Sequence, residues 1–530
     1  MKMKANQLSS GVLLSYVGQG LQILIALFYT PVILRLLGQS EYGVYQIAYS
    51  VMSVLSLFNF GFSNSYIKFF SVAKKGENAE QQVAGLNGLF MMIFSALSVL
   101  VVAVGAVLTL KIDAVLGGSL TAAELDTARI VLPIMVLNCA LSFLGVVFRN
   151  YIIAHERFIA LQGLDILGTV LNPCLTFPLL LTGKGSVGLA LILLAVTAVK
   201  DLFSAFYCIF KLRMRFSRCA MPWSAFRGIA VFSLFIFAEN IVTAINLNVD
   251  RFFLGKMIGT AAAAIYAVGG QINTLYTTLV ISISSVFAPR VNEMVAKGGD
   301  REALSALYVR VGKIQFSVMG LILGGFAVFG KRFMLIWAGS EYGDSYWIAL
   351  ILLLSVTLHL VQHVAVEIQR SLGLQKYRSM ICIVTALLKL CVSFALIPLL
   401  GGIGAAIGTA VAYVLNTVAV DILYAKRAGL KVWVFWREIT RMACGALPPV
   451  VLGLLAIRYI NSCRLIVYFV CIAVFALLYL VSMYLLGLRR ADRVHLRILF
   501  ERWINTYLKK GKSSATAEHT PEHQQGEEEL

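Results

Sequence analysis

Residues 83–110, VAGLNGLFMMIFSALSVLVVAVGAVLTL, contain no charged side chain. A helix needs about 20 mostly apolar residues to cross the hydrocarbon core of a bilayer. This stretch therefore predicts one transmembrane helix.

About fourteen segments of this kind follow one another along the sequence, separated by short polar stretches. Each is too long and uninterrupted for a transmembrane strand, which has about ten alternating residues. The sequence predicts an all-α integral membrane protein with about 14 transmembrane helices. Their expected bounds are 11–36, 42–68, 83–110, 127–150, 158–181, 186–210, 226–254, 258–288, 308–336, 346–369, 379–399, 402–425, 441–460 and 463–487.

The composition agrees with this class. The chain has 530 residues, of which 59% are hydrophobic and only 13% charged, yet its formal net charge is +19. Soluble domains carry about 25% charged residues, so these charges are too few to coat several soluble domains. A soluble enzyme and a disordered chain are excluded. The nine cysteines form no CxxC pair or Cys/His cluster, so neither a zinc site nor a disulfide framework is expected.

The basic residues predict the orientation. Lys2 and Lys4 precede an apolar run of about 25 residues without a small-residue cleavage site, which favours a first transmembrane helix over a signal peptide. With the N-terminus in the cytoplasm, about 33 Lys and Arg residues fall inside and about 10 outside. Both termini are therefore expected in the cytoplasm, with the basic loops on anionic lipid.

Several polar side chains fall at membrane depth, where a charge costs at least about 3 kcal/mol. On the seventh expected helix, Glu239, Thr243, Asn246 and Asp250 share one helical face. Such polar residues also serve as contacts between helices, and that alternative stays open for any single amide.

Further charged candidates are spread over other helices. Lys200 and Lys389 lie within apolar segments, whereas Arg149 lies near a cytoplasmic end, where it can also snorkel to the headgroups. His359 and His363 share a face of the tenth helix, but no Glu follows the first His as in a zinc-protease helix, so no metal site is expected.

Motifs of soluble chemistry are absent from the sequence. It contains no GxxxxGK[ST] phosphate loop and no nucleophile elbow. The chain is therefore not expected to be an enzyme or to hold a cofactor.

Two motif-like stretches carry a family resemblance. The first is PVILRLLGQSEYG at residues 31–43, with Gly18, Gln19 and Tyr45, and with Gly61, Phe62 and Lys68 further on. The second is NVDRFFLG at residues 248–255, followed by IYAV at residues 265–268. The chain resembles the polysaccharide-transporter family of oligosaccharide flippases, in the superfamily that also contains the MATE drug exporters and the lipid II flippase. Where that family often has Arg after the second helix, this chain has Lys68.

The resemblance implies two six-helix lobes around a central cavity and two additional helices. The expected organisation is an N-terminal lobe at 1–211, a cytoplasmic amphipathic linker at 212–225, a C-terminal lobe at 226–428, two further helices at 429–487, and an amphipathic helix with a disordered tail at 488–530.

The resemblance also implies a function. It implies alternating-access transfer of a polyprenyl-diphosphate-linked oligosaccharide across the cytoplasmic membrane of a bacterium or archaeon, next to a polysaccharide polymerase partner. A diphosphate needs cationic partners, and the candidates are Arg149, Lys200, Arg251 and Lys389. Candidates for H⁺ or Na⁺ coupling are Glu239, Asp250, His359 and His363.

Three alternatives remain at this point. A MATE-type cation-coupled drug or metabolite exporter would favour an acidic, aromatic cavity. A membrane glycan polymerase or ligase would need a large outer loop, but no loop here exceeds roughly 15 residues. A scaffold protein that transports nothing would leave the charged residues at membrane depth without a role.

Overall fold

The computed structural model describes residues 2–74, 78–217, 233, 237, 240–242, 244–462, 464–489 and 492–493. These residues form helices joined by short turns, and no strand occurs among them. The expected linker beyond residue 217 and most of the expected C-terminal helix and tail lie outside the described residues. Eleven helical segments in the described part are long and apolar enough to cross a membrane. The predicted all-α membrane class is confirmed.

The difference between eleven segments and about fourteen expected ones has two causes. Helix α1 (Lys2–Leu55) joins the first two expected spans, and α15 (Gln375–Leu423) joins the eleventh and twelfth. The seventh expected span, 226–254, lies largely outside the described residues. The structure is therefore consistent with about fourteen crossings.

Glycines divide both long helices. Gly38 has φ 75° and Gly401 has φ 58°, values in the left-handed region that favours glycine. After Gly401 the chain folds back on itself, because Gly408 lies against Ser393 and Asn416 Nδ2 donates to Thr385 Oγ1 at 3.0 Å. Helix α15 thus contains two antiparallel spans.

The described chain forms two compact units. The first comprises residues 1–315 and 329–432 and holds the cavities described below. Its helices are α1, α2 (Phe62–Ala73), α3 (Ala79–Leu110), α4 (Ile112–Leu116), α5 (Ala122–Ala154), α6 (Phe158–Leu181), α7 (Gly185–Phe206), α9 (Asp250–Met257), α10 (Thr260–Ser285), α11 (Ala288–Ala296), α13 (Ser345–Leu360), α14 (His363–Ser371), α15 and the two ends of α12 (Arg301–Trp337).

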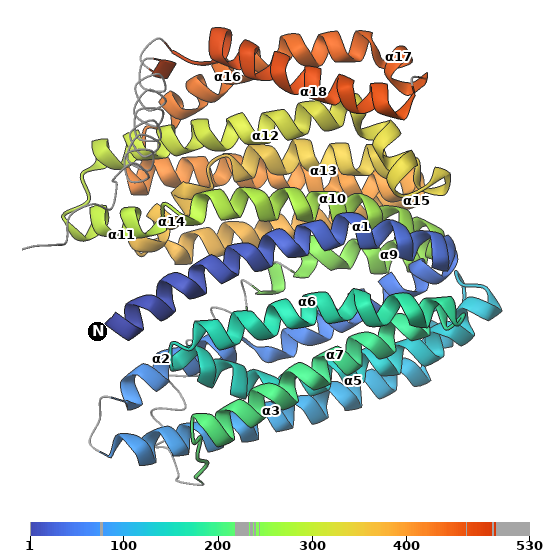
Figure 1. Cartoon of the computed structure of the whole chain (residues 1–530), viewed down its shortest axis with the longest axis vertical. Helices are drawn as coiled ribbons and strands as arrows, with labels where there is room; N and C mark the ends of the chain where they lie inside the picture. Colours follow the sequence, from blue (N-terminus) through green and yellow to red (C-terminus); the bar gives the residue numbers. More distant parts are fainter. Residues whose placement is uncertain are drawn as a thin grey trace, which may run out of the picture. The chain divides into compact units, whose positions relative to one another are not determined.

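Helix α1 is the shared element of this first unit. It packs against α5, α6 and α7 of the N-terminal half and against α9 and α10 of the C-terminal half. Figure 1 shows α1 between α6 and α10. Side chains on α1 can therefore face both halves.

The second unit comprises residues 316–328 and 433–530. It contains the middle of α12 together with α16 (Val432–Leu455), α17 (Ile457–Ser462) and α18 (Leu465–Ser482). Ser482 Oγ donates to the carbonyl of Gly445 at 2.6 Å, and Tyr479 donates to that of Ser317 at 3.1 Å. Buried Glu438 pairs with Arg489.

Large apolar side chains lie both inside the first unit and on its surface. Phe90, Phe94 and Val101 of α3 are fully buried against α5. On the same helix Val99 and Leu110 are 70% and 83% exposed. A helix that is apolar on its buried and exposed faces alike is typical of a membrane span in contact with lipid.

Candidate functional site

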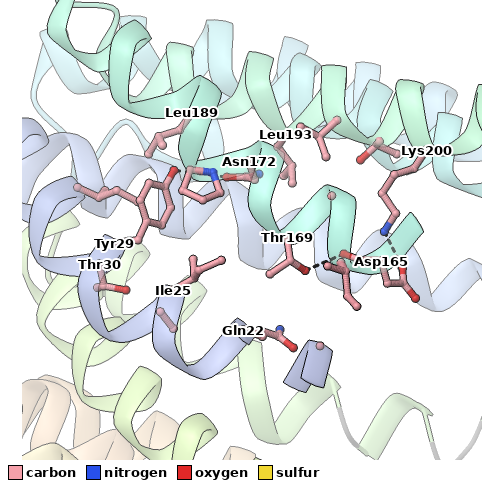
Figure 2. Close-up of a pocket in the computed structure, with 18 of the residues that line it drawn as sticks. Gln22, Ile25, Tyr29, Thr30, Asp165, Thr169, Asn172, Leu189, Leu193 and Lys200 are labelled. Atoms are coloured by element: carbon pink, nitrogen blue, oxygen red, sulfur yellow. Dashed lines mark hydrogen bonds and ion pairs between the residues drawn. The ribbon is translucent and has the colours of Figure 1, made fainter. Parts of the chain in front are cut away.

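A cavity of about 640 Å³ lies in the first unit between α1, α6 and α7 (Figure 2). Amide and hydroxyl groups make up much of its wall. They come from Ser15, Gln19, Gln22, Tyr29, Thr30, Tyr42, Tyr45, Gln46, Gln162, Thr169, Asn172, Thr197 and Gln271. The charged lining residues are Asp165 of α6 and Lys200 of α7.

Asp165 bridges two of the predicted cationic residues. Its Oδ1 lies 2.8 Å from Lys200 Nζ, and its Oδ2 lies 2.6 Å from Arg149 Nη2. The three side chains come from three helices, α5, α6 and α7. None is fully buried, since Asp165, Lys200 and Arg149 are 28%, 27% and 42% exposed. We call these three residues the Asp165 cluster.

Glycines allow the three helices to approach at this cluster. A Cβ at Gly168 would lie 2.7 Å from Cδ of Lys200, and one at Gly145 would meet the carboxylate of Asp201. Small residues of this kind permit close packing of transmembrane helices. Asp201 therefore packs against α5, and its buried Oδ2 has no hydrogen-bond partner in the described part of the chain.

A second cavity of about 370 Å³ lies among α1, α9, α10, α13 and α15. It shares Tyr45, Gln46 and Gln271 with the first cavity, so the two adjoin at these side chains. Its other polar lining residues are Tyr49, Asn246, Asn248, Arg251, Tyr266, Asn273, Thr274, Thr409 and Tyr413.

Arg251 is the charged residue that faces the second cavity. Its Nη1 donates to Gln46 Oε1 at 3.1 Å, which places the guanidinium near the junction of the two cavities. The buried Nε has no hydrogen-bond partner among the described residues. Arg251 thus has a donor left for a further acceptor.

Lys389 has a different environment from Lys200. Its Nζ lies 2.8 Å from Asp250 Oδ2, and both side chains have zero exposure. The same ammonium donates to the carbonyls of Ile245 and Asn246 at 2.9 Å each. These carbonyls belong to a π-helical turn, Ile245–Val249, which directly precedes α9. The three N–H donors of Lys389 are therefore all satisfied inside the protein.

Asp250 is held by hydroxyls as well. Tyr266 donates to Asp250 Oδ2 at 2.7 Å, and Thr409 donates to the same oxygen at 3.2 Å. Asp250 Oδ1 is buried and has no hydrogen-bond partner within the described ranges. The pair thus joins α9 to both α10 and α15.

The two histidines lie near the same region. The ring of His359 packs against that of Tyr413, with 5.6 Å between ring centroids and a tilt of 34°, and Tyr413 lines the second cavity. The ring of His363 shares a hydrogen bond of 2.8 Å with Ser284 Oγ through Nδ1. Glu239, the remaining predicted coupling residue, lies outside the described residues.

Glu124 joins three helices near the end of the first unit where Gly38 divides α1. Its Oε1 accepts from Ser40 and from Thr260, at 2.5 Å each, while its Oε2 accepts from the backbone N–H of Thr121 at 2.8 Å. We call Glu124, Ser40 and Thr260 the Glu124 junction. Nearby, Arg35 Nη2 donates to the carbonyl of Ile336 at 2.9 Å. These bonds connect α1 and α5 to the C-terminal half of the unit.

Sequence reasoning missed Asp165 and Glu124. Asp165 is the single charged residue of the expected span 158–181, and that signal was available. Glu124 follows Thr121 by three residues and completes a capping box, which explains its position but not its two interhelical bonds.

The fold and the site together define a class: a multi-pass, all-α membrane protein with polar cavities that carry cations at membrane depth. Residues 8–295, more than half of the chain, match a family model described as polysaccharide biosynthesis protein. The chain belongs to this polysaccharide biosynthesis family.

Individual relatives agree with the family. A protein of Shigella flexneri assigned as an O-antigen transporter is 20% identical over 420 residues, which cover 77% of this chain and 96% of the relative. The uncharacterized membrane protein EpsK of Bacillus subtilis (strain 168) is 25% identical over 339 residues, which cover 61% and 63%. The predicted family resemblance is confirmed.

Solved structures show the same fold. The lipid II flippase MurJ, in an inward closed conformation, superimposes with a TM-score of 0.73 at 14% identity over 92% of this chain and all of that one. An inward-facing MATE-family multidrug transporter gives a TM-score of 0.56 at 14% identity over 78% and 94%. These likenesses show that the chain has the same fold as these two transporters.

Proposed function

We propose that this protein is a flippase that transfers a polyprenyl-diphosphate-linked oligosaccharide across the cytoplasmic membrane by alternating access. One observation carries the proposal: two adjoining polar cavities each present a cation, Lys200 in the first and Arg251 in the second. A cation kept at membrane depth and facing a cavity is typical of a substrate pathway. Charge-assisted hydrogen bonds to phosphate would repay its cost.

The rest of the lining suits a glycan. Amides such as Gln22, Asn172 and Gln271 offer both donors and acceptors to sugar hydroxyls. Tyr29 and Tyr45 add aromatic surface and hydroxyl groups. Membership of the polysaccharide biosynthesis family supports the same substrate class.

The drug-exporter alternative fits the lining less well. A cationic cargo would need uncompensated carboxylates in the wall of the cavity. Asp165, the carboxylate that lines the first cavity in the described chain, is already paired with Lys200 and Arg149. We therefore propose an anionic cargo.

We propose a transport cycle that uses the Glu124 junction. Closure at this junction leaves the cavities to be loaded from the opposite end, which the distribution of basic residues places in the cytoplasm. The proposal puts both termini in the cytoplasm of a bacterium or archaeon, where the basic loops contact anionic lipids. A polysaccharide polymerase would use the exported product.

Coupling to H⁺ or Na⁺ remains part of the proposal, but at fewer of the predicted positions. Asp250 is balanced by Lys389, so this carboxylate is poorly suited to bind another cation. We propose His359 as the proton-coupling candidate, because its ring packs on Tyr413 at the second cavity and its buried Nδ1 has no partner among described residues. His363, which shares a hydrogen bond with Ser284, stays the second proton-coupling candidate. In His359→Gln, transport should lose its response to an imposed pH gradient; an unchanged response contradicts this role.

The main test is reconstitution in liposomes with a fluorescent lipid-linked oligosaccharide, scored by its accessibility in the outer leaflet. We expect Lys200→Ala and Arg251→Ala to reduce transfer at least tenfold. Lys256→Ala removes an exposed cation of α9 that lines neither cavity, and it should transfer normally. Wild-type transfer by both cavity variants would overturn the proposal.

A further inference from the structure

Asp165 holds Lys200, which lines the first cavity, together with Arg149 of α5. Each carboxylate oxygen takes one cation, Oδ1 that of Lys200 and Oδ2 that of Arg149. A phosphate group offers oxygens of the same charge and hydrogen-bonding character. The carboxylate thus occupies, in the structure, the position that a phosphate of the substrate would need in order to contact both cations.

The bridge is open to exchange. Asp165 and Lys200 both line the cavity and are 28% and 27% exposed (Figure 2). The other membrane-depth pair, Asp250 and Lys389, has zero exposure on both sides. It makes four further hydrogen bonds, two from Lys389 to backbone carbonyls and two from the hydroxyls of Tyr266 and Thr409 to Asp250. A ligand in the cavity can therefore reach the first pair, whereas the second is sealed.

The charges define what can displace Asp165. Asp165, Lys200 and Arg149 together carry one net positive charge. The neighbouring carboxylate of Asp201 is not part of this bridge, because it packs against α5 at Gly145. A diphosphate brings more than one negative charge and several acceptor oxygens, so it can compensate both cations better than one carboxylate. A neutral or singly charged headgroup gains little over the carboxylate already tethered there.

The two ion pairs of Asp165 also stabilise the transporter when no substrate is bound. Leaving Lys200 and Arg149 without a counter-ion at membrane depth would be costly. A tethered carboxylate removes that cost after substrate release and keeps the phosphate from being held too tightly. Both effects follow from competition for the same two cations.

We propose that Asp165 is a built-in competitor of the substrate diphosphate: it leaves Lys200 and Arg149 when the lipid-linked substrate binds and returns to them on release. Asp165 is thereby a positioning and specificity-determining residue. This inference rests on the proposed function, since it assumes that these cations receive a diphosphate.

The test is binding of farnesyl diphosphate and farnesyl phosphate to the purified full-length protein. In Asp165→Asn, which keeps the shape of the side chain, the diphosphate should bind about tenfold more tightly, which corresponds to about 1.4 kcal/mol. The preference for diphosphate over monophosphate should shrink. Transfer of the lipid-linked oligosaccharide should slow, because release becomes harder. Asp165→Glu should restore both properties in part.

A purely structural Asp165 would give another pattern, with binding and transfer both weakened. Asp113→Asn is the matched control, because Asp113 pairs with Arg129 at 2.7 Å and lines neither cavity, so this variant should leave diphosphate affinity unchanged. Unchanged or weaker diphosphate binding by folded Asp165→Asn overturns the inference.

Lys200→Ala separates this inference from the proposed function. If Lys200→Ala weakens diphosphate binding while Asp165→Asn does not strengthen it, only the competitor role fails. If Lys200→Ala, Arg149→Ala and Arg251→Ala all bind farnesyl diphosphate like the wild type, the diphosphate site itself is wrong and the proposed function fails with it.

Discussion

Lys389 and Asp250 form an ion pair of 2.8 Å in which neither side chain has any exposed surface. Two backbone carbonyls and two hydroxyls complete the shell around the pair. Both charges are thus compensated inside the C-terminal half of the first unit. The pair is suited to hold α9 and α15 together rather than to bind a substrate.

The Lys389–Asp250 pair predicts that substitutions at these two residues have non-additive effects on the free energy of unfolding. Lys389→Met and Asp250→Asn should each destabilise the protein by about 3–5 kcal/mol, because each leaves one buried charge uncompensated. The double variant should be less destabilised than the sum of the two, since it removes both charges. Thermal unfolding of the purified protein in detergent measures the loss of stability in each variant. Additive losses would show that the two residues act independently.

Glu124 predicts a change in the conformational equilibrium. Glu124→Ala removes two charge-assisted hydrogen bonds to Ser40 and Thr260, each contributing about 1.5–3 kcal/mol. The closed end should therefore open more often. A cysteine introduced at Thr30, in a background without native cysteines, should react at least tenfold faster with an impermeant maleimide added from that side.

Two variants control for effects on helix caps. Glu124→Gln retains the capping box and should show an intermediate rate. Glu80→Ala removes an exposed first-turn carboxylate of α3 and should not change labelling. Equal labelling in Glu124→Ala and the wild type would mean that the junction does not close this end.

The close approach of Lys200 to Gly168 allows a steric test of the Asp165 cluster. In Gly168→Ala the new Cβ would lie 2.7 Å from Lys200 Cδ, so the lysine must shift, and we expect its contact with Asp165 to weaken. We expect transfer of the lipid-linked oligosaccharide to fall several-fold. Gly163→Ala is the matched control on the same helix, because nothing lies within 4 Å of its Cβ. Equal loss in both variants would point to a general effect on α6.

Arg251 predicts a dependence on geometry as well as charge. Arg251→Lys keeps the charge but loses the fork of donors that contacts Gln46. The half-saturating concentration of lipid-linked substrate should rise about tenfold in Arg251→Ala, which corresponds to one charged hydrogen bond, and less in Arg251→Lys. Initial transfer rates at varied substrate density in liposomes give this value. Wild-type values in both variants would remove the guanidinium from the site.

The sequence predicted several helices closely. The expected span 158–181 coincides with α6 (Phe158–Leu181), and 83–110 lies within α3 (Ala79–Leu110). Hydrophobic length is a property of the local sequence, which explains this agreement. The continuous joins at Gly38 and Gly401 were not predicted, because their backbone angles depend on how the flanking spans pack.

The candidate site was only partly predictable. Lys200 was found because a cation inside an apolar segment is conspicuous, and Arg149 because it ends such a segment. Their common partner, Asp165, was not connected to them, since the three residues lie on separate helices. Gly168 explains the connection, because it lets α7 bring Lys200 close to α6.

The sequence by itself determined that the chain is a helical membrane protein of the polysaccharide biosynthesis family with a few cations at membrane depth. Span length and charge are encoded residue by residue, so they can be read without the fold. Only the tertiary structure decided which of these cations a ligand can reach. Lys200 faces a cavity, and its partner carboxylate, Asp165, also pairs with Arg149. Lys389 instead pairs with Asp250, and neither of these two side chains has exposed surface. That difference arises from the packing of helices distant in sequence, which fixes both the partner of each charge and its exposure.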